Sequence, residues 1–166
     1  PLNSTVFPDA IFRQYVSDNF DKNKDGVLSE EEIAKVKKIR VLGYGVTSLD
    51  GIEVFYALES LDCSCNKLSK LDVSKNTSLE ILYCSNNQLS ELDVSKNTKL
   101  RILYCYDNQL SKLDVSKNTM LQDLYCSDNK LSKLDVSKNT SLEELWCYYN
   151  QLSKLDVSKN TMLQDL

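Results

Sequence analysis

The chain has 166 residues, of which 42% are hydrophobic and 27% are charged, with a formal net charge of −4. This length suits one globular or solenoid unit, and the acidic balance argues against nucleic-acid binding, which needs clustered Lys and Arg that outweigh nearby acids. The absence of histidine removes Ser-His and Cys-His nucleophilic sites and the commonest zinc ligand. No stretch approaches the roughly 18 apolar residues of a membrane-spanning helix, so we expect no membrane insertion. The opening residues lack the pattern of a signal peptide.

The first element in chain order is a helix predicted between Pro8 and Phe20. Its apolar residues follow a helical stripe, and Pro8 stands near its start, where proline is tolerated. A second helix is predicted over residues 30–38. A polar stretch of twelve residues, from Asp21 to Glu32, leads from the first helix into the second.

This polar stretch matches the EF-hand calcium-binding loop at every diagnostic position, including Gly at position 6 and Glu at position 12. Calcium takes six to eight oxygen ligands. The loop offers oxygens from Asp21, Asn23, Asp25, the Val27 carbonyl, Ser29 and Glu32. We therefore expect a Ca²⁺ site with a structural role, because calcium sensors use paired hands that expose a groove. The segment also resembles half of a dockerin, which carries two such loops where this chain has one. The alternative is a polar turn between two helices without a metal.

From Leu58 onward the sequence repeats every 21 residues, and each unit begins with a leucine: Leu58, Leu79, Leu100, Leu121, Leu142 and Leu163. Within a unit, apolar residues stand at positions 1, 4, 6, 11, 14 and 16. Positions 4 and 6 alternate as in a short strand, and the Asn at position 9 is expected to turn the chain away from it. A degenerate unit precedes the regular ones, and its apolar residues are Val36, Ile39, Val41, Val46, Leu49 and Ile52. We interpret it as the first, capping repeat.

One unit alone cannot fold, because the burial of its six apolar side chains does not offset the conformational entropy lost by ordering the whole unit. The units must stack into a solenoid with one continuous core and covered ends. We predict an α+β chain, with a helical EF-hand-like cap over residues 1–38 and a solenoid over residues 39–166. The degenerate repeat extends to about residue 57, and the regular array is truncated at the C-terminus. The expected cap contacts are Phe7, Ile11, Phe12, Tyr15 and Phe20.

Five cysteines recur at position 6 and should therefore stack on adjacent strands: Cys63, Cys84, Cys105, Cys126 and Cys147. Parallel strands lie about 4.7–4.9 Å apart, beyond the usual disulfide Cβ separation of about 3.5–4.5 Å. We predict a ladder of buried, free thiols that act as small hydrophobic groups. No histidine or CxxC pair supports metal binding by the ladder. Cys65 lies off the ladder and is expected to be the most accessible thiol.

The pattern LxxLxCxxNxLxxLDVSKNT, which runs from Leu58 to the end, resembles the cysteine-containing repeats of bacterial surface leucine-rich-repeat proteins of the internalin J-like type. The resemblance implies a leucine-rich-repeat solenoid with a parallel β-sheet on its concave face. It also implies a secreted or cell-surface location and a role in adhesion or protein recognition.

A comparison of the units with one another locates the expected binding surface. The segment SKLDVSKNT barely changes, whereas the outward strand positions vary and carry aromatic residues: Tyr83, Tyr104, Tyr106, Tyr125, Trp146, Tyr148 and Tyr149. Alternate strand side chains leave opposite faces, so these residues should line the concave face and bind the ligand. Tyr and Trp are enriched at binding hot spots. They can equally stack on one another and stabilise the sheet, and the two interpretations are compatible.

The sequence therefore predicts an extracellular binding or adhesion module that recognises a host or bacterial surface protein. The alternative is a carbohydrate-binding solenoid, since aromatic rows also stack on sugar rings. Three carboxylates near the sheet, Asp123, Glu143 and Glu144, are the candidate catalytic groups. They stand among surface charges without a base partner, so we predict no catalytic residue and no enzyme activity.

Overall fold

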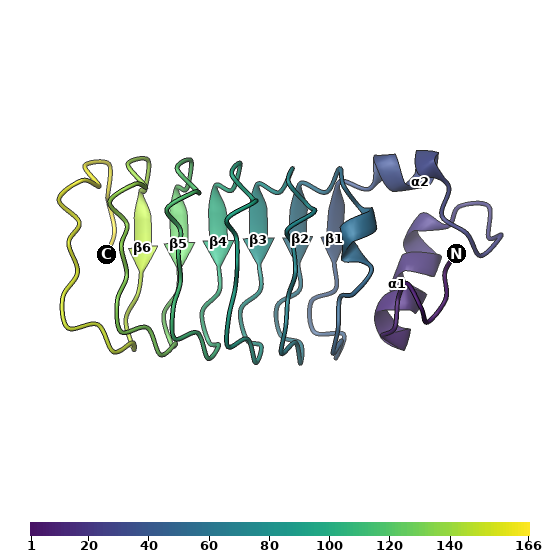
Figure 1. The fold of residues 1–166 in the computed structure, drawn as a ribbon, viewed down its shortest axis with the longest axis horizontal. Coiled ribbons are helices and arrows are strands. Elements are labelled where there is room, and N and C mark those ends of the chain that lie inside the picture. Colours follow the sequence, from purple (N-terminus) through teal and green to yellow (C-terminus); the bar gives the residue numbers. More distant parts are fainter.

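The molecule is an elongated solenoid with two helices at its N-terminal end and the strands in a row behind them (Figure 1). The computed structural model describes all 166 residues. The helices are α1 (Ala10–Phe20) and α2 (Glu30–Lys35), with a short 3-10 helix, η1 (Ile52–Val54), in the first repeat. The strands are β1 (Lys38–Arg40), β2 (Ser60–Asp62), β3 (Ile81–Tyr83), β4 (Ile102–Tyr104), β5 (Asp123–Tyr125) and β6 (Glu144–Trp146). Neither helix has the length and hydrophobicity of a membrane-spanning segment.

The strands form one parallel sheet in sequence order from β1 to β6. Equivalent positions pair in register, so that Leu82 lies beside Leu103 and Tyr83 lies beside Tyr104. The central residue of every strand is buried and its two neighbours are more exposed, because alternate side chains leave opposite faces. The 21-residue period therefore returns the chain to the same place one strand further along, and the predicted leucine-rich-repeat solenoid is confirmed.

One hydrophobic cluster runs through the repeats and the cap. It includes all six apolar residues predicted for the degenerate first unit: Val36, Ile39, Val41, Val46, Leu49 and Ile52. The cysteine ladder is also confirmed, since four of its members are buried, Cys147 is partly buried and all six thiols are free. Burial raises the pKa of Cys105 to about 12, which keeps this side chain a neutral thiol. Cys65 is exposed, as expected.

Asp9 fastens the first helix to the first repeat. One carboxylate oxygen accepts hydrogen bonds from the backbone N–H groups of Ile11 and Phe12, both at 2.9 Å, as an N-cap residue does. The other oxygen accepts from the backbone N–H and the hydroxyl of Thr47, both at 2.8 Å. A single carboxylate thus fixes both the start of α1 and its position against the solenoid.

Aromatic packing completes the contact between the cap and the first repeat. Phe7 and Phe12 are buried, and the rings of Phe7 and Phe20 lie 6.3 and 5.5 Å from the ring of Phe55. The prediction for Ile11 was wrong, because this residue is 42% exposed and does not join the hydrophobic cluster. Gly51 adopts a left-handed φ of 101°, and a Cβ there would stand 2.4 Å from the Phe7 ring, so the close approach requires glycine.

The second helix is shorter than predicted. It begins at a capping box in which Ser29 and Glu32 bond each other's backbone N–H groups. It ends at Lys35 because the chain must become extended to enter β1 at Lys38.

The asparagines at position 9 of each unit form a buried or partly buried hydrogen-bonding row rather than the turn itself. The Asn129 side-chain amide donates to the carbonyls of Cys105, Cys126 and Ser127 at 3.0, 3.2 and 3.1 Å. Its oxygen accepts from the Leu110 backbone N–H at 2.9 Å. The preceding position makes the turn, because its residue is left-handed in every unit: Cys65, Asn86, Asp107, Asp128 and Tyr149. The sequence interpretation is corrected accordingly.

A second row of buried asparagines lies in the nearly constant segment SKLDVSKNT. Its members are Asn76, Asn97, Asn118, Asn139 and Asn160. The side-chain amide of Asn118 donates to the carbonyls of Val94 and Asn97 in the preceding repeat at 3.0 and 2.9 Å. Each repeat is therefore bonded to its neighbour on both sides of the core.

Candidate functional site

Four aromatic residues end successive strands of the sheet, and we call them the aromatic row: Tyr83, Tyr104, Tyr125 and Trp146. The backbone places them in register, one strand apart. Their side chains lie on the sheet face opposite the buried leucines. This is the face that the sequence predicts for them. The row is therefore a surface feature of the parallel sheet.

The rings of the row stack on one another along the solenoid. The Tyr104 and Tyr125 ring centroids lie 4.1 Å apart with an interplanar angle of 2°, and Tyr125 and Trp146 lie 4.2 Å apart at the same angle. Tyr83 tilts against Tyr104 at 4.8 Å and 38°. Neighbours therefore cover both faces of the Tyr125 ring, and the surface displays ring edges and hydroxyl groups. Such pairs contribute about 0.5–1.5 kcal/mol each beyond their buried area.

The remaining predicted ligand-binding residues lie just beyond the strand ends. Tyr148 lies 6.3 Å from Trp146 and Tyr149 lies 5.3 Å from Tyr148, measured between ring centroids. Tyr148 and Tyr149 are 53% and 77% exposed, whereas Tyr106 is only partly exposed. The aromatic surface thus continues from the row around the end of β6.

Carboxylates lie beside the aromatic row on the same face. Asp123 and Glu144 pair in register as the first residues of β5 and β6, and Asp165 pairs with Glu144 in turn. We call these three residues the acidic column. The Tyr125 hydroxyl hydrogen-bonds to the Glu144 carboxylate, which joins the column to the row. The sequence interpretation treated Asp123 and Glu144 as scattered surface charges. Both residues stand at position 3 of their repeats, on the same face as the aromatic position 5, and this shared position could have predicted that they lie side by side.

The neighbouring carboxylates of the acidic column repel one another. Partial burial, followed by the nearby carboxylates of Glu144 and Glu143, raises the pKa of Asp123, and Arg101 only partly offsets this rise. Burial and the hydrogen bond to Glu144 likewise raise the pKa of the Tyr125 phenol. Tyr125 therefore stays protonated and donates to Glu144.

The predicted metal loop connects α1 to α2. The Asp21 carboxylate is buried and accepts hydrogen bonds from the backbone N–H groups of Asp25 at 3.2 Å and Gly26 at 2.9 Å. The Asp25 carboxylate accepts from the Val27 N–H at 2.8 Å. These bonds curve the loop around its first acid, and the left-handed φ of 78° at Gly26 permits the bend.

The contacts of Glu32 show whether the loop, in this conformation, is arranged to bind calcium. Its carboxylate accepts hydrogen bonds from the Ser29 N–H at 2.9 Å, the Ser29 hydroxyl at 2.8 Å and the Lys22 N–H at 2.7 Å. These bonds lower the pKa of Glu32 and hold it at the start of α2. No three acidic side chains converge as a metal cluster. The loop supplies the oxygen types that calcium requires, and Glu32 would have to leave Ser29 and Lys22 to join them.

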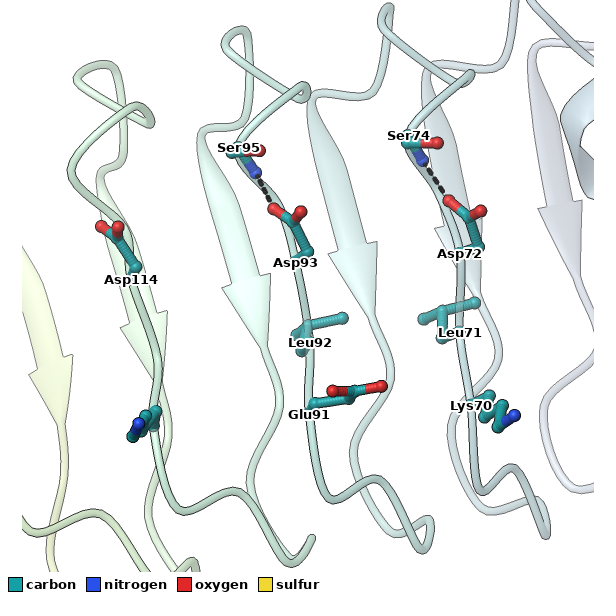
Figure 2. Close-up of a pocket in the computed structure, with 10 residues that line it drawn as sticks. Lys70, Leu71, Asp72, Ser74, Glu91, Leu92, Asp93, Ser95 and Asp114 are labelled. Atoms are coloured by element: carbon teal, nitrogen blue, oxygen red, sulfur yellow. Dashed lines mark hydrogen bonds between the residues drawn. The ribbon is translucent and has the colours of Figure 1, made fainter.

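Shallow grooves run between the connecting segments, away from the strands. Figure 2 shows one of about 760 Å³ whose walls come from three successive repeats. The carboxylates of Asp72 and Asp93 each accept a hydrogen bond from the backbone N–H of a serine two residues later, at 2.9 and 2.8 Å, so they stabilise the turns of the connecting segments. Similar grooves recur at Lys133 and further along, so they follow from the uniform segment rather than from a specialised site.

Comparisons with known proteins agree with this architecture. Residues 77–118 and 119–160 match the family model for leucine-rich repeats in two copies, and together they cover about half of the chain. A stretch of 71 residues is 40% identical to internalin J of Listeria monocytogenes, covering 43% of this chain and 8% of that protein.

Solved structures show the same likeness over almost the whole chain. The functional domain of InlJ from Listeria monocytogenes, which includes a cysteine ladder, is 32% identical with a TM-score of 0.66, covering 98% of this chain and 46% of that one. An internalin, InlF, from the same species is 27% identical with a TM-score of 0.88, covering 98% and 50%. This chain therefore spans half or less of the length of these relatives. Its repeats, its sheet and its cysteine ladder show that the chain belongs to the leucine-rich-repeat family and is internalin-like.

Proposed function

We propose that this chain is an extracellular module that binds a protein partner through the aromatic row and the tyrosines beside it. It acts by binding rather than by catalysis, in adhesion or recognition, and works as a secreted or cell-surface protein of a bacterium. The similarity to internalins supports the location and the binding role. The concentration of aromatic residues on one sheet face, partly exposed along the row and exposed at Trp146, Tyr148 and Tyr149, carries the choice of surface.

The stacked geometry favours a protein over a carbohydrate. A sugar ring stacks on the open face of an aromatic ring, but the faces of Tyr104 and Tyr125 are covered by their neighbours. Ring edges and hydroxyl groups remain on the surface, and these suit the mixed apolar and polar contacts of protein interfaces. The stack also fixes the rings before binding, which reduces the entropy lost when a partner docks.

Capture of surface proteins from host cells and from bacteria, run beside a glycan array, tests this proposal. The captured protein is then titrated against the wild type and a variant that combines Tyr104→Ala, Tyr125→Ala and Trp146→Ala. We expect the variant to lose more than about 2 kcal/mol of binding free energy, because aromatic anchors dominate interfaces. Lys75→Ala and Lys117→Ala, in the uniform connecting segments, should bind as the wild type does. Binding that survives the triple variant, or that is confined to glycans, would refute the proposal.

The proposal includes a calcium ion in the loop between α1 and α2. Asp21, Asn23, Asp25, the Val27 carbonyl and Ser29 lie along the loop, and Glu32 would complete the set after leaving its capping position. The ion would tie the end of α1 to the start of α2 and so stabilise the cap. Extracellular calcium modules of this type bind at about 10⁻⁴ to 10⁻³ M.

Calorimetric titration with CaCl₂ and thermal melts with and without calcium test the site. We expect binding in that range and a higher melting temperature, since a ligand that binds only the folded state stabilises it. Glu32→Gln should abolish both effects while keeping the helix start, because glutamine also serves in a capping box. Glu31→Gln, on the same turn but outside the ligand set, is the matched control. An unchanged calcium response in Glu32→Gln would show that the loop is a metal-free turn.

A further inference from the structure

We infer that the segment of the partner that docks on β5 and β6 is basic, and that its Lys or Arg side chains meet the acidic column beside the aromatic row. This inference rests on the proposed protein-binding function and specifies the chemistry of the partner. It follows from the charges of the sheet face, which differ between its two ends.

At the N-terminal end of the sheet the two acids of the second strand's segment, Glu59 and Asp62, each pair with a base. Asp62 pairs with Arg40 at 3.3 Å, and Glu59 pairs with Lys37 at 3.0 Å. These pairs lie across neighbouring repeats, so the face is neutralised from within over β1 and β2. No partner charge is needed there.

At the C-terminal end the acids form no ion pair. The ion pairs of the protein lie in the cap and first two strands, and none involves Asp123, Glu143, Glu144 or Asp165. The one guanidinium nearby, Arg101, donates to the Gln122 side-chain oxygen at 3.1 and 2.9 Å. Like charges directly opposite each other on adjacent strands are destabilising, so the unpaired column costs the free protein stability. A cation brought by a partner would relieve that cost.

The surroundings of the column select the kind of cation. Tyr125 and Glu144 are joined by a hydrogen bond, and the rings of Tyr125 and Trp146 stand directly alongside in a wall of ring edges. A Lys or Arg side chain can lay its apolar stem along this wall and place its charged head on the carboxylates. The strands β3 and β4 present Ile81 and Ile102 at the corresponding position, so the same face offers apolar contact next to the charge. An amphipathic basic segment of a protein can therefore contact both the apolar residues of β3 and β4 and the carboxylates of β5 and β6.

Fluorescence of Trp146, the single tryptophan of the chain, reports on this surface. The probes are two 12-residue peptides, one of alternating Lys and Val and the other of alternating Glu and Val. We expect saturable changes with the Lys peptide, none with the Glu peptide, and weaker binding at high salt because screening reduces the attraction. The double variant Asp123→Asn and Glu144→Gln should bind the Lys peptide about tenfold more weakly. It should also fold at least as stably as the wild type, since it removes repulsion, and thermal melts check this.

The matched control is Glu59→Gln with Asp62→Asn, which removes two carboxylates from the neutralised end of the same face and should leave binding unchanged. Equal binding of the two peptides, or full binding by the Asp123 and Glu144 variant, would overturn the inference. The captured protein partner separates this inference from the proposed function. If the captured partner loses affinity for the aromatic triple variant but binds the Asp123 and Glu144 double variant as it binds the wild type, only the inferred basic segment is refuted. If the captured partner binds the aromatic triple variant as it binds the wild type, the proposed function itself is refuted.

Discussion

Replacement of Asn129 by alanine tests whether the buried asparagine row, rather than the leucines alone, holds the repeats together. Asn129 is 8% exposed and lies in the middle of the array. Its side chain bonds two adjacent repeats at once, because its amide reaches carbonyls at Cys105 and Cys126 while its oxygen holds the Leu110 N–H. Alanine cannot replace any of these bonds.

The expected loss follows from the hydrogen bonds. The two amide hydrogens and one oxygen make about three effective bonds, each worth about 1 kcal/mol net, so Asn129→Ala should cost about 3 kcal/mol. Asn150 makes the equivalent bonds to Cys126, Cys147 and Leu131 but is only half buried. Water can reach the groups that Asn150→Ala leaves free, so this matched variant should cost about 1 kcal/mol.

Urea unfolding followed by circular dichroism measures both losses, with the slope checked for each variant. A cost below about 1 kcal/mol for Asn129→Ala, or an equal cost for the two variants, would refute the reasoning. The carbonyls of the turn would then be satisfied without the side chain, and leucine packing alone would join the repeats.

Three further outcomes are expected. Tyr149→Asn should stabilise the protein by about 1 kcal/mol in thermal melts, because Tyr149 has a left-handed φ of 50° that asparagine tolerates better. An unchanged melting temperature would show that the backbone at Tyr149 is not strained. A thiol reagent should count six cysteines in the denatured, non-reduced protein, while the native protein should react first at exposed Cys65 and not at Cys105, whose pKa burial raises to about 12. Burial opposes ionisation of Asp9, but hydrogen bonds from Phe12, Thr47 and Ser48 prevail and lower its pKa. Its contribution to stability is present above the unfolded-state pKa and is lost as pH falls through the folded-state pKa, so Asp9→Asn should lose stability at pH 7 and show a weaker acid dependence in melts at pH 7 and pH 3.

The repeat period made most of the fold predictable. A spacing of 21 residues that never slips allows only one stacking register, so the inward positions of the leucines, valines and cysteines follow from counting. The free-thiol ladder followed from the strand spacing in the same way. The loop ligands could be proposed because the EF-hand pattern specifies side-chain oxygens by position. These properties are local or periodic, and a linear sequence displays both.

The side-chain geometry of the surface depended on the tertiary structure. The sequence placed Tyr104, Tyr125 and Trp146 on one face, but only the folded register brought their rings within 4.2 Å and covered their faces. Asp123 and Glu144 are 21 residues apart in the sequence, and their repulsion and lack of an ion pair emerge only when adjacent strands are aligned. Glu32 fitted a calcium ligand by position, while the folded loop gives it hydrogen-bond partners at Ser29 and Lys22. A repeat pattern determines which face a residue occupies, whereas the distances across strands that set stacking, charge and hydrogen bonding exist only in the assembled solenoid.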